Sequence, residues 1–228
     1  MTSNLAPWNV LLDPQGTFSA LEQKPRWLFS LSLLVLSNLA IWIYYYQVVD
    51  FDWLQNFLVS SNPDIRTGNE RAQALHFLQR GNLVRMACLG VLIGIPLMCL
   101  ISATYYSLVG KLMGIDERFP AWYGFVVSTA FPGILSVPVM LGAVLMSDGR
   151  ISPEQMNLLS INSLFFDGNA EAPFKGLMDA LNLTTLWSVA LAGYGLRQWS
   201  GRSWWLCLFV ALLPMAMIYG AWLAASMA

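Results

Sequence analysis

Charged residues are scarce in this chain of 228 residues: only 11% are Asp, Glu, Lys or Arg, against about a quarter in soluble domains. The formal net charge is -1, so the chain lacks the basic field that nucleic-acid-binding proteins carry. Hydrophobic residues, by contrast, make up 57% of the sequence. These proportions exclude an ordinary soluble globule, predict no nucleic-acid partner, and indicate a protein of the lipid bilayer.

Residues that could carry chemistry are also few. The one histidine, His76, has no second His or Cys at zinc-ligand spacing. Cys88, Cys99 and Cys207 lie inside apolar runs, which favours buried free thiols over disulfides. The sequence also lacks the G-x-S-x-G, H-E-x-x-H, P-loop and G-x-G-x-x-G signatures. We therefore predict no enzymatic activity, no cofactor and no metal site.

What the chain does contain is long apolar runs, each near the roughly 20 residues that a helix needs to cross the hydrocarbon core. They predict an all-α membrane protein, a bundle of five transmembrane helices within residues 27–228. The spans are expected at about 27–49, 83–109, 120–146, 177–196 and 203–226. Pro132, Pro138 and Pro214 lie inside these spans and predict kinks, since proline removes a backbone donor.

Residues 1–26 precede the first span and carry a helix signal of their own. Asp13 is a suitable N-cap, and Pro14 suits the first helical position. Phe18 and Leu21 then share one face. This segment is therefore expected to be a cytoplasmic leader containing a short amphipathic helix that lies at the membrane interface.

Lys and Arg near the ends of the spans predict the orientation. The leader and the two short loops all fall on one side of a five-span chain. They carry Lys24, Arg26, Lys111, Arg118, Arg197 and Arg202. Because short segments count most in this rule, we predict a cytoplasmic N-terminus and a C-terminus outside.

Small residues recur at helical spacing in four of the predicted spans. Residues four apart share a helix face, and small ones allow two backbones to approach closely. These helix-packing or interface candidates are Gly90, Gly94, Gly124, Ser128, Ser188, Ala192, Ala216, Gly220 and Ala224. Packing inside the bundle is the favoured interpretation, and contact with a partner's helices is the alternative.

Polar residues gather in the stretch "ALNLTTLWSVALAGYGLRQWSGR", residues 180–202. Thr184, Thr185 and Ser188 can bond to a preceding carbonyl of their own helix. The amide of Asn182 needs a partner in a neighbouring helix or a place near the interface. Two hypotheses stay open: a polar packing face, or the lining of a path through a bundle of broken helices.

Four stretches together carry a resemblance to a known family. They are "LLDPQGTFSALEQKPRWLFSLSLLVLSNLA", "SLVGKLMGIDERFPAWYGFVVSTAFPGILSVPV", "EAPFKGLMDALNLTTLWSVALAGYGLRQWSG" and the closing apolar run. Their D-P leader, P-x-W step and mid-helix P-x-x-L resemble the bacterial branch of the Yip family, named after Ypt-interacting protein one, and the third stretch is similar to that family's late L-D-x-x-x-x-W piece. Thr185 departs from that pattern, which has an apolar or aromatic residue there.

The resemblance implies a five-span helical protein of the bacterial inner membrane with a cytoplasmic N-terminus and no catalytic residues. Eukaryotic relatives are associated with Rab-type GTPases, which bacteria lack, and some bacterial members look like accessory subunits of export systems. We therefore predict a non-enzymatic protein that acts through helix packing with itself or with a membrane-protein partner, as an accessory or assembly factor of an export complex. The alternative is a channel, a small-molecule permeation path or a lipid-handling protein.

Overall fold

The computed structural model describes residues 7–24, 26–62, 65, 67–168 and 174–227, and the regular structure of these residues is helical apart from an isolated β-bridge between Ser160 and Asn182. The chain begins with α1 (Asn9–Leu12), α2 (Pro14–Gln23) and α3 (Leu28–Val48), followed by α4 (Phe51–Ser60) and α5 (Gly68–Phe77). The remaining elements are α6 (Arg80–Leu89), the π-helix η1 (Gly90–Gly94), α7 (Ile95–Leu112), α8 (Phe119–Ala130), the 3₁₀ helix η2 (Phe131–Leu135), α9 (Ser136–Met146), α10 (Ile161–Phe166), α11 (Lys175–Ala180), α12 (Leu183–Ser200) and α13 (Trp204–Met227). The predicted all-α class is confirmed for these residues.

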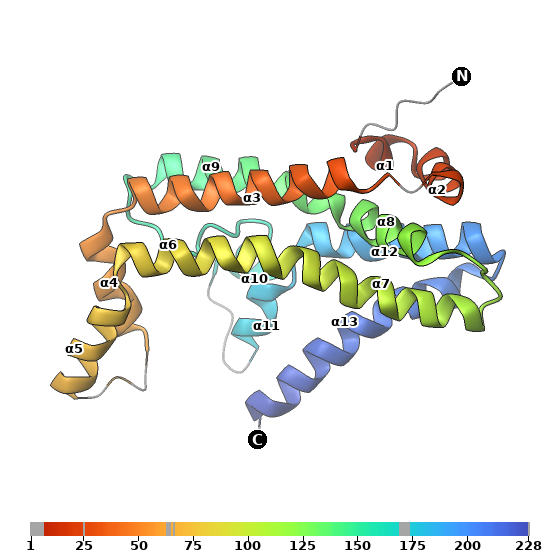
Figure 1. Cartoon of the computed structure of the whole chain (residues 1–228). Helices are drawn as coiled ribbons and strands as arrows, with labels where there is room; N and C mark the ends of the chain where they lie inside the picture. The colour runs from red at the N-terminus through yellow and green to blue at the C-terminus, as the bar shows by residue number, and fades with distance from the viewer. Residues whose placement is uncertain (1–6, 25, 63–64, 66, 169–173, 228) are drawn as a thin grey trace.

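Four helical units within the described part of the chain are long and apolar enough to cross a membrane: Leu28–Val48, Arg80–Leu112, Phe119–Met146 and Trp204–Ala224. The second unit runs through α6, η1 and α7, and the third through α8, η2 and α9. These candidate spans overlap the runs expected at 27–49, 83–109, 120–146 and 203–226. Figure 1 shows the first three of these units lying lengthwise beside α12, whereas α13 leaves the bundle at a slant.

The span predicted at 177–196 is wrong as a continuous helix. α11 ends at Ala180, Leu181 and Asn182 are extended, and α12 begins at Leu183. At 1.5 Å per residue, the 18 residues of α12 measure about 27 Å. Its last turn carries the polar residues Arg197 and Gln198, and α12 is not among the four apolar units. The count of five spans is therefore not confirmed. α12 packs among α2, α8 and α13 (Figure 1), and these protein contacts tolerate its polar residues.

The three prolines predicted to kink their spans occupy different positions. Pro132 is buried in η2, where α-helical bonding gives way to a 3₁₀ turn between α8 and α9. Pro138 lies in the first turn of α9, and Pro214 lies inside α13. The α-helix is interrupted at Pro132, whereas it continues through the other two prolines.

The N-terminal helix α2 begins at the predicted residues. Asp13 caps it by accepting a hydrogen bond from the Gly16 backbone N–H at 2.9 Å, and Pro14 is its first residue. Phe18 and Leu21 are only 0% and 2% exposed, because their face is covered by α8 and α12. The apolar face thus packs on protein, and a position at the membrane interface stays a prediction. Pro25, in the P-x-W step, lies outside the described residues.

Side-chain bonds fasten α2 to the end of α12. Gln198 donates to the Gln15 carbonyl at 3.0 Å and to the Ser19 hydroxyl at 2.8 Å. The indole N–H of Trp199 donates to the Phe18 carbonyl at 3.3 Å. The leader is therefore part of the bundle. The main hydrophobic core of the bundle joins α2 with α3, α7, α8, α12 and α13.

A second core lies at the other end of the bundle, where α3, α4 and α9 meet the segment that follows α9. Tyr45 is fully buried there and donates its hydroxyl to the Ile151 carbonyl at 2.9 Å. Asp50 forms an ion pair with Arg150 at 3.2 Å. The Trp53 backbone N–H and the Arg150 guanidinium hold the pKa of Asp50 below its usual range. These contacts fix residues 147–160 across this end of the bundle.

Candidate functional site

The Asn182 side chain forms a polar junction at the start of α12. Its Oδ1 accepts hydrogen bonds from the backbone N–H and the hydroxyl of Thr184, both at 3.1 Å, so it is the N-cap of the helix. Its Nδ2 donates to Asn157 Oδ1 at 2.6 Å. Asn182 therefore bonds to the loop before α10, which is neither a neighbouring span nor a path.

Two further amides complete this junction, and sequence reasoning missed both. Asn162, which is 1% exposed, donates to Asp179 Oδ1 at 2.6 Å. Asn157 donates to the Asp179 backbone carbonyl at 3.0 Å. The bridge between Ser160 and Asn182 joins the two segments through their backbones. No sequence signal reveals these pairings, because the partners lie 17 to 25 residues apart in short helices and the segments around them.

Replacing Asn182 by leucine is expected to lower the free energy of unfolding by about 1–3 kcal/mol, since it removes an N-cap and a hydrogen bond between two partly buried amides. Unfolding in detergent micelles, followed by circular dichroism, measures the loss. Asn182→Asp is the matched control, because aspartate keeps the cap acceptor but cannot donate to Asn157. An unchanged Asn182→Leu protein would contradict the structural role of the junction.

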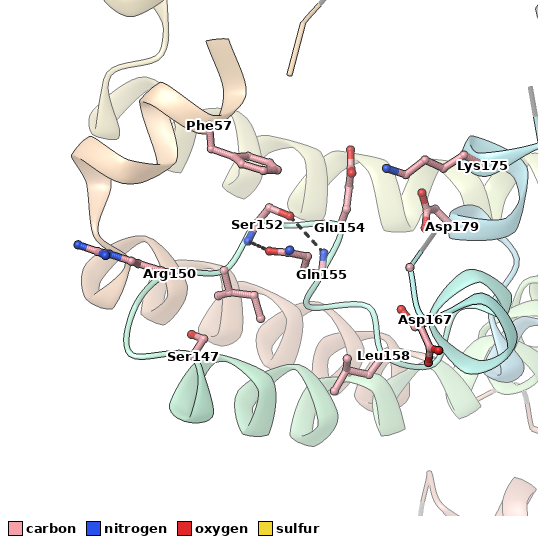
Figure 2. A pocket seen from close by; sticks show the side chains of 13 residues that line it. Phe57, Ser147, Arg150, Ser152, Glu154, Gln155, Leu158, Asp167, Lys175 and Asp179 are labelled. Carbon is pink, nitrogen blue, oxygen red and sulfur yellow. Dashed lines mark hydrogen bonds between the residues drawn. The ribbon is translucent and has the colours of Figure 1, made fainter. Parts of the chain in front are cut away.

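A polar cavity of about 690 Å³ lies next to the junction, between α4, α11 and the segment after α9. Figure 2 shows Lys175 and Asp179 at one end of it and Arg150 at the other. Ser152 and Gln155 close a turn in its wall by two reciprocal hydrogen bonds of 2.9 and 3.3 Å. The charges are mixed, and within the described residues no three His, Cys, Asp or Glu side chains group as metal ligands. The cavity is polar and lies outside the four apolar units.

A second cavity, which we call the groove, has a volume of about 440 Å³ and lies among the apolar helices. α7 contributes one face of Met98, Ser102 and Tyr106, and α8 with η2 contributes Val126, Thr129, Ala130 and Gly133. The other walls are Thr184, Thr185, Ser188, Val189 and Ala192 of α12, and Ala211, Pro214, Met215, Ile218 and Tyr219 of α13. The structure thus brings Thr184, Thr185, Ser188, Ala192 and Pro214 of the predicted residues together, and leaves Asn182 outside.

Most hydroxyls of the groove already donate to the protein. Ser188 donates to the Thr184 carbonyl at 2.8 Å, and Thr129 donates to the Val126 carbonyl at 3.0 Å. The hydroxyls of Tyr106 and Tyr219 donate to backbone carbonyls at 3.5 Å. Ser102 and Thr185 differ, because their hydroxyls have no hydrogen-bond partner among the described residues. These two hydroxyls remain available to a ligand.

One of the small residues predicted to pack, Ser188, lines the groove. The others fall into two groups. Gly124, Ser128 and Ala192 are buried, and a Cβ at Gly124 would be 2.9 Å from Leu21 Cδ2. At Gly90, Gly94 and Gly220, by contrast, a Cβ would meet nothing within 4 Å, and Ala216 and Ala224 are exposed. An interface of this second group with another molecule stays a prediction.

Three glycines that spacing did not single out also make close contacts. A Cβ at Gly110 would overlap the Trp122 ring. One at Gly195 would lie 2.5 Å from Phe125, and one at Gly193 would lie 3.2 Å from the Cα of Leu208. Gly193 and Gly195 stand two apart rather than four because they face different neighbours. No sequence signal could have found them, because their neighbours come from other helices.

Comparison with known proteins gives one match, to a protein family. No curated protein and no solved structure matches the chain. The family model of the Yip1 domain, however, matches residues 8–225, nearly the whole length from the α2 leader to the slanted α13. The chain is therefore a membrane protein of apolar helices that belongs to the Yip1 domain family.

Proposed function

We propose that the protein is non-enzymatic and acts by packing its helices against a membrane-protein partner or a second copy of itself. The observation that carries the proposal is the pair Gly90 and Gly94 in the apolar unit Arg80–Leu112. Both glycines have open space where a side chain would project. Glycines four residues apart let a second helix approach closely, and no helix in the part of the chain that the structure describes lies within 4 Å of a Cβ at either position.

In a bacterium, such a protein fits an accessory or assembly factor of an inner-membrane export complex. This role rests on the resemblance to the bacterial branch of the family, and Yip1 domain membership supports it. The channel and permeation alternatives receive less support, because Asn182 caps a helix instead of lining the groove. The lipid-handling alternative is favoured by the groove itself.

The double variant Gly90→Leu/Gly94→Leu tests the packing proposal. A photoreactive side chain placed at the exposed Ile93 is expected to give a discrete adduct in membranes, either with a second copy or with one partner. The double variant is expected to reduce that adduct at least tenfold, because leucine fills the space that the second helix would occupy.

Gly142→Leu is the matched control for this experiment. A Cβ at Gly142 also meets nothing within 4 Å, but this glycine lies in α9. The control is expected to leave the adduct unchanged. A protein that gives no adduct at Ile93, or the same adduct in the double variant, would contradict the proposal.

The proposed orientation places the N-terminus in the cytoplasm and the C-terminus outside, and it takes α12 as a fifth crossing beside the four apolar units. The hydrogen bonds from Gln198 to α2 bring the leader and the end of α12 together, so the cations of both segments gather at one end of the bundle. The Asp50–Arg150 ion pair marks the opposite end. A phosphatase fused after Ala228 is expected to be active and one fused after Ile115 silent. The reverse pattern would overturn the orientation.

A further inference from the structure

The groove has a wedge shape that follows from two neighbouring contacts. α12 and α13 meet tightly where Gly193 faces Leu208, with 3.2 Å between a Cβ at Gly193 and the Leu208 Cα. α13, which contains Pro214, slants away from the bundle toward its C-terminus (Figure 1). Its far part is tied to α11 by the Tyr219 hydroxyl, which donates to the Ala180 carbonyl at 3.5 Å. The space between these two contacts is the groove.

Three of the four walls of the groove belong to units that are long and apolar enough to span a bilayer. The groove is therefore expected to lie at the level of the hydrocarbon. Its lining is mainly apolar, with Met98, Val126, Val189, Met215 and Ile218 among the side chains. Water would find few bonding partners along these walls.

Size separates the two apolar occupants that a membrane offers. A partner helix is about 10 Å across, so only its side chains can enter a groove of about 440 Å³. A flexible acyl chain, by contrast, can lie wholly inside it. A methylene group occupies nearly the volume of a water molecule, about 30 Å³. The groove therefore has room for about 15 methylene groups, which is one fatty acyl chain.

The free hydroxyls add a polar contact to this apolar space. Thr185 lies in the first turn of α12, at the end of the groove where Tyr219 joins α11. An unpartnered hydroxyl surrounded by hydrocarbon carries a desolvation cost that a hydrogen-bond acceptor removes. The ester carbonyl of a phospholipid is such an acceptor, and it is joined directly to the acyl chain.

We propose that the groove between α7, α8, α12 and α13 binds one acyl chain of a membrane phospholipid, whose ester carbonyl accepts a hydrogen bond from Thr185. The chain extends from Thr185 toward Val126 and Ala211. The bound lipid fills the wedge between α12 and α13. This site does not depend on the packing proposed at Gly90 and Gly94, which lie outside the groove.

Native mass spectrometry of the full chain, extracted in mild detergent and washed free of bulk lipid, tests the proposal. One phospholipid per chain is expected to remain bound. Gly133→Leu is expected to reduce the retained lipid at least tenfold, because Gly133 lines the groove and has open space at its Cβ position. Gly142→Leu makes the same change outside the groove and is expected to retain the lipid.

A second pair of variants tests the hydrogen bond and keeps the question decidable if Gly133→Leu does not fold. Thr185→Val is expected to bind the lipid about threefold to tenfold more weakly, the effect of losing one hydrogen bond. Thr104→Val is its control, because the Thr104 hydroxyl already donates to the Leu100 carbonyl on an exposed face of α7.

The position of the lipid is read out with a phospholipid that carries a photoreactive group in its acyl chain. Reconstituted protein is expected to be labelled on α12 and α13 at the groove, in preference to the exposed Leu92. Three outcomes would overturn the proposal: no retained phospholipid, equal retention in wild type and Gly133→Leu, or labelling spread evenly over the exposed faces.

Discussion

Replacing Phe18 by alanine is expected to lower the free energy of unfolding in detergent micelles by about 3–5 kcal/mol, the range for deleting a buried aromatic ring. The Phe18 side chain is 0% exposed. Its ring centroid lies 5.2 Å from that of Phe125, 6.4 Å from Tyr194 and 6.5 Å from Trp199. The cavity left by alanine cannot collapse easily, because these neighbours are held by two other helices.

The same substitution is expected to release the N-terminal helix. Phe18 is the largest side chain that α2 places in the main core, so hydrogen exchange of the α2 amides is expected to rise well above that of α8. Phe29→Ala is the matched control: this ring is 66% exposed at the start of α3, and its loss is expected to change stability by less than about 0.5 kcal/mol. Equal losses in both variants, or unchanged exchange in α2, would contradict the docking of α2.

The long apolar elements could be predicted from the sequence because length and hydropathy alone define them. The helix from Leu28 to Val48 matches the expected 27–49 within a residue at each end. The prediction of one continuous helix at 177–196 was wrong, because hydropathy does not show where a side chain bonds to the backbone and interrupts the helix. Asn182 accepts from the Thr184 N–H and so begins a new helix, a capping pattern that hydropathy does not detect.

Spacing of small residues predicted which residues share a face, but not what lies opposite them. Gly124 and Gly90 carry the same signal, yet one meets Leu21 and the other meets open space. The difference depends on which helices become neighbours. That choice is made by large residues elsewhere, such as Phe18 and Trp122, whose burial fixes where α2 and α8 lie.

The groove could be predicted only in part. Thr184, Thr185 and Ser188 were recognised as unusual for a span, and all three line it. Its other wall on α7, with Ser102, carries no distinguishing sequence signal. The groove exists because α13 diverges from α12, and the crossing angle of two helices follows from packing at Gly193 and Leu208 rather than from a local motif.

Gly110→Ala, which adds a single methyl group, is expected to lower the free energy of unfolding of the bundle. Gly110 lies in α7, where alanine is favoured over glycine by about 0.5–1 kcal/mol in a helix. The added Cβ would nevertheless overlap the Trp122 ring, which is 0% exposed. Overpacking of this kind costs about 1–3 kcal/mol or more, so the net free energy of unfolding is expected to fall.

The Trp122 ring cannot shift to make room for the added methyl group without losing its own packing contacts. The expected loss of stability is therefore specific to Gly110. Its ring is packed edge-on against Trp199 at 5.0 Å and Phe125 at 5.7 Å between centroids. Its Nε1 is buried without a hydrogen-bond partner among the described residues, so packing alone holds the ring in place. Gly94→Ala is the control, because the same methyl group meets open space there and should leave stability equal or slightly higher. Unfolding in detergent micelles compares the free energies of the two variants. If Gly110→Ala were as stable as Gly94→Ala, the close contact of Gly110 in α7 with Trp122 in α8 would be contradicted.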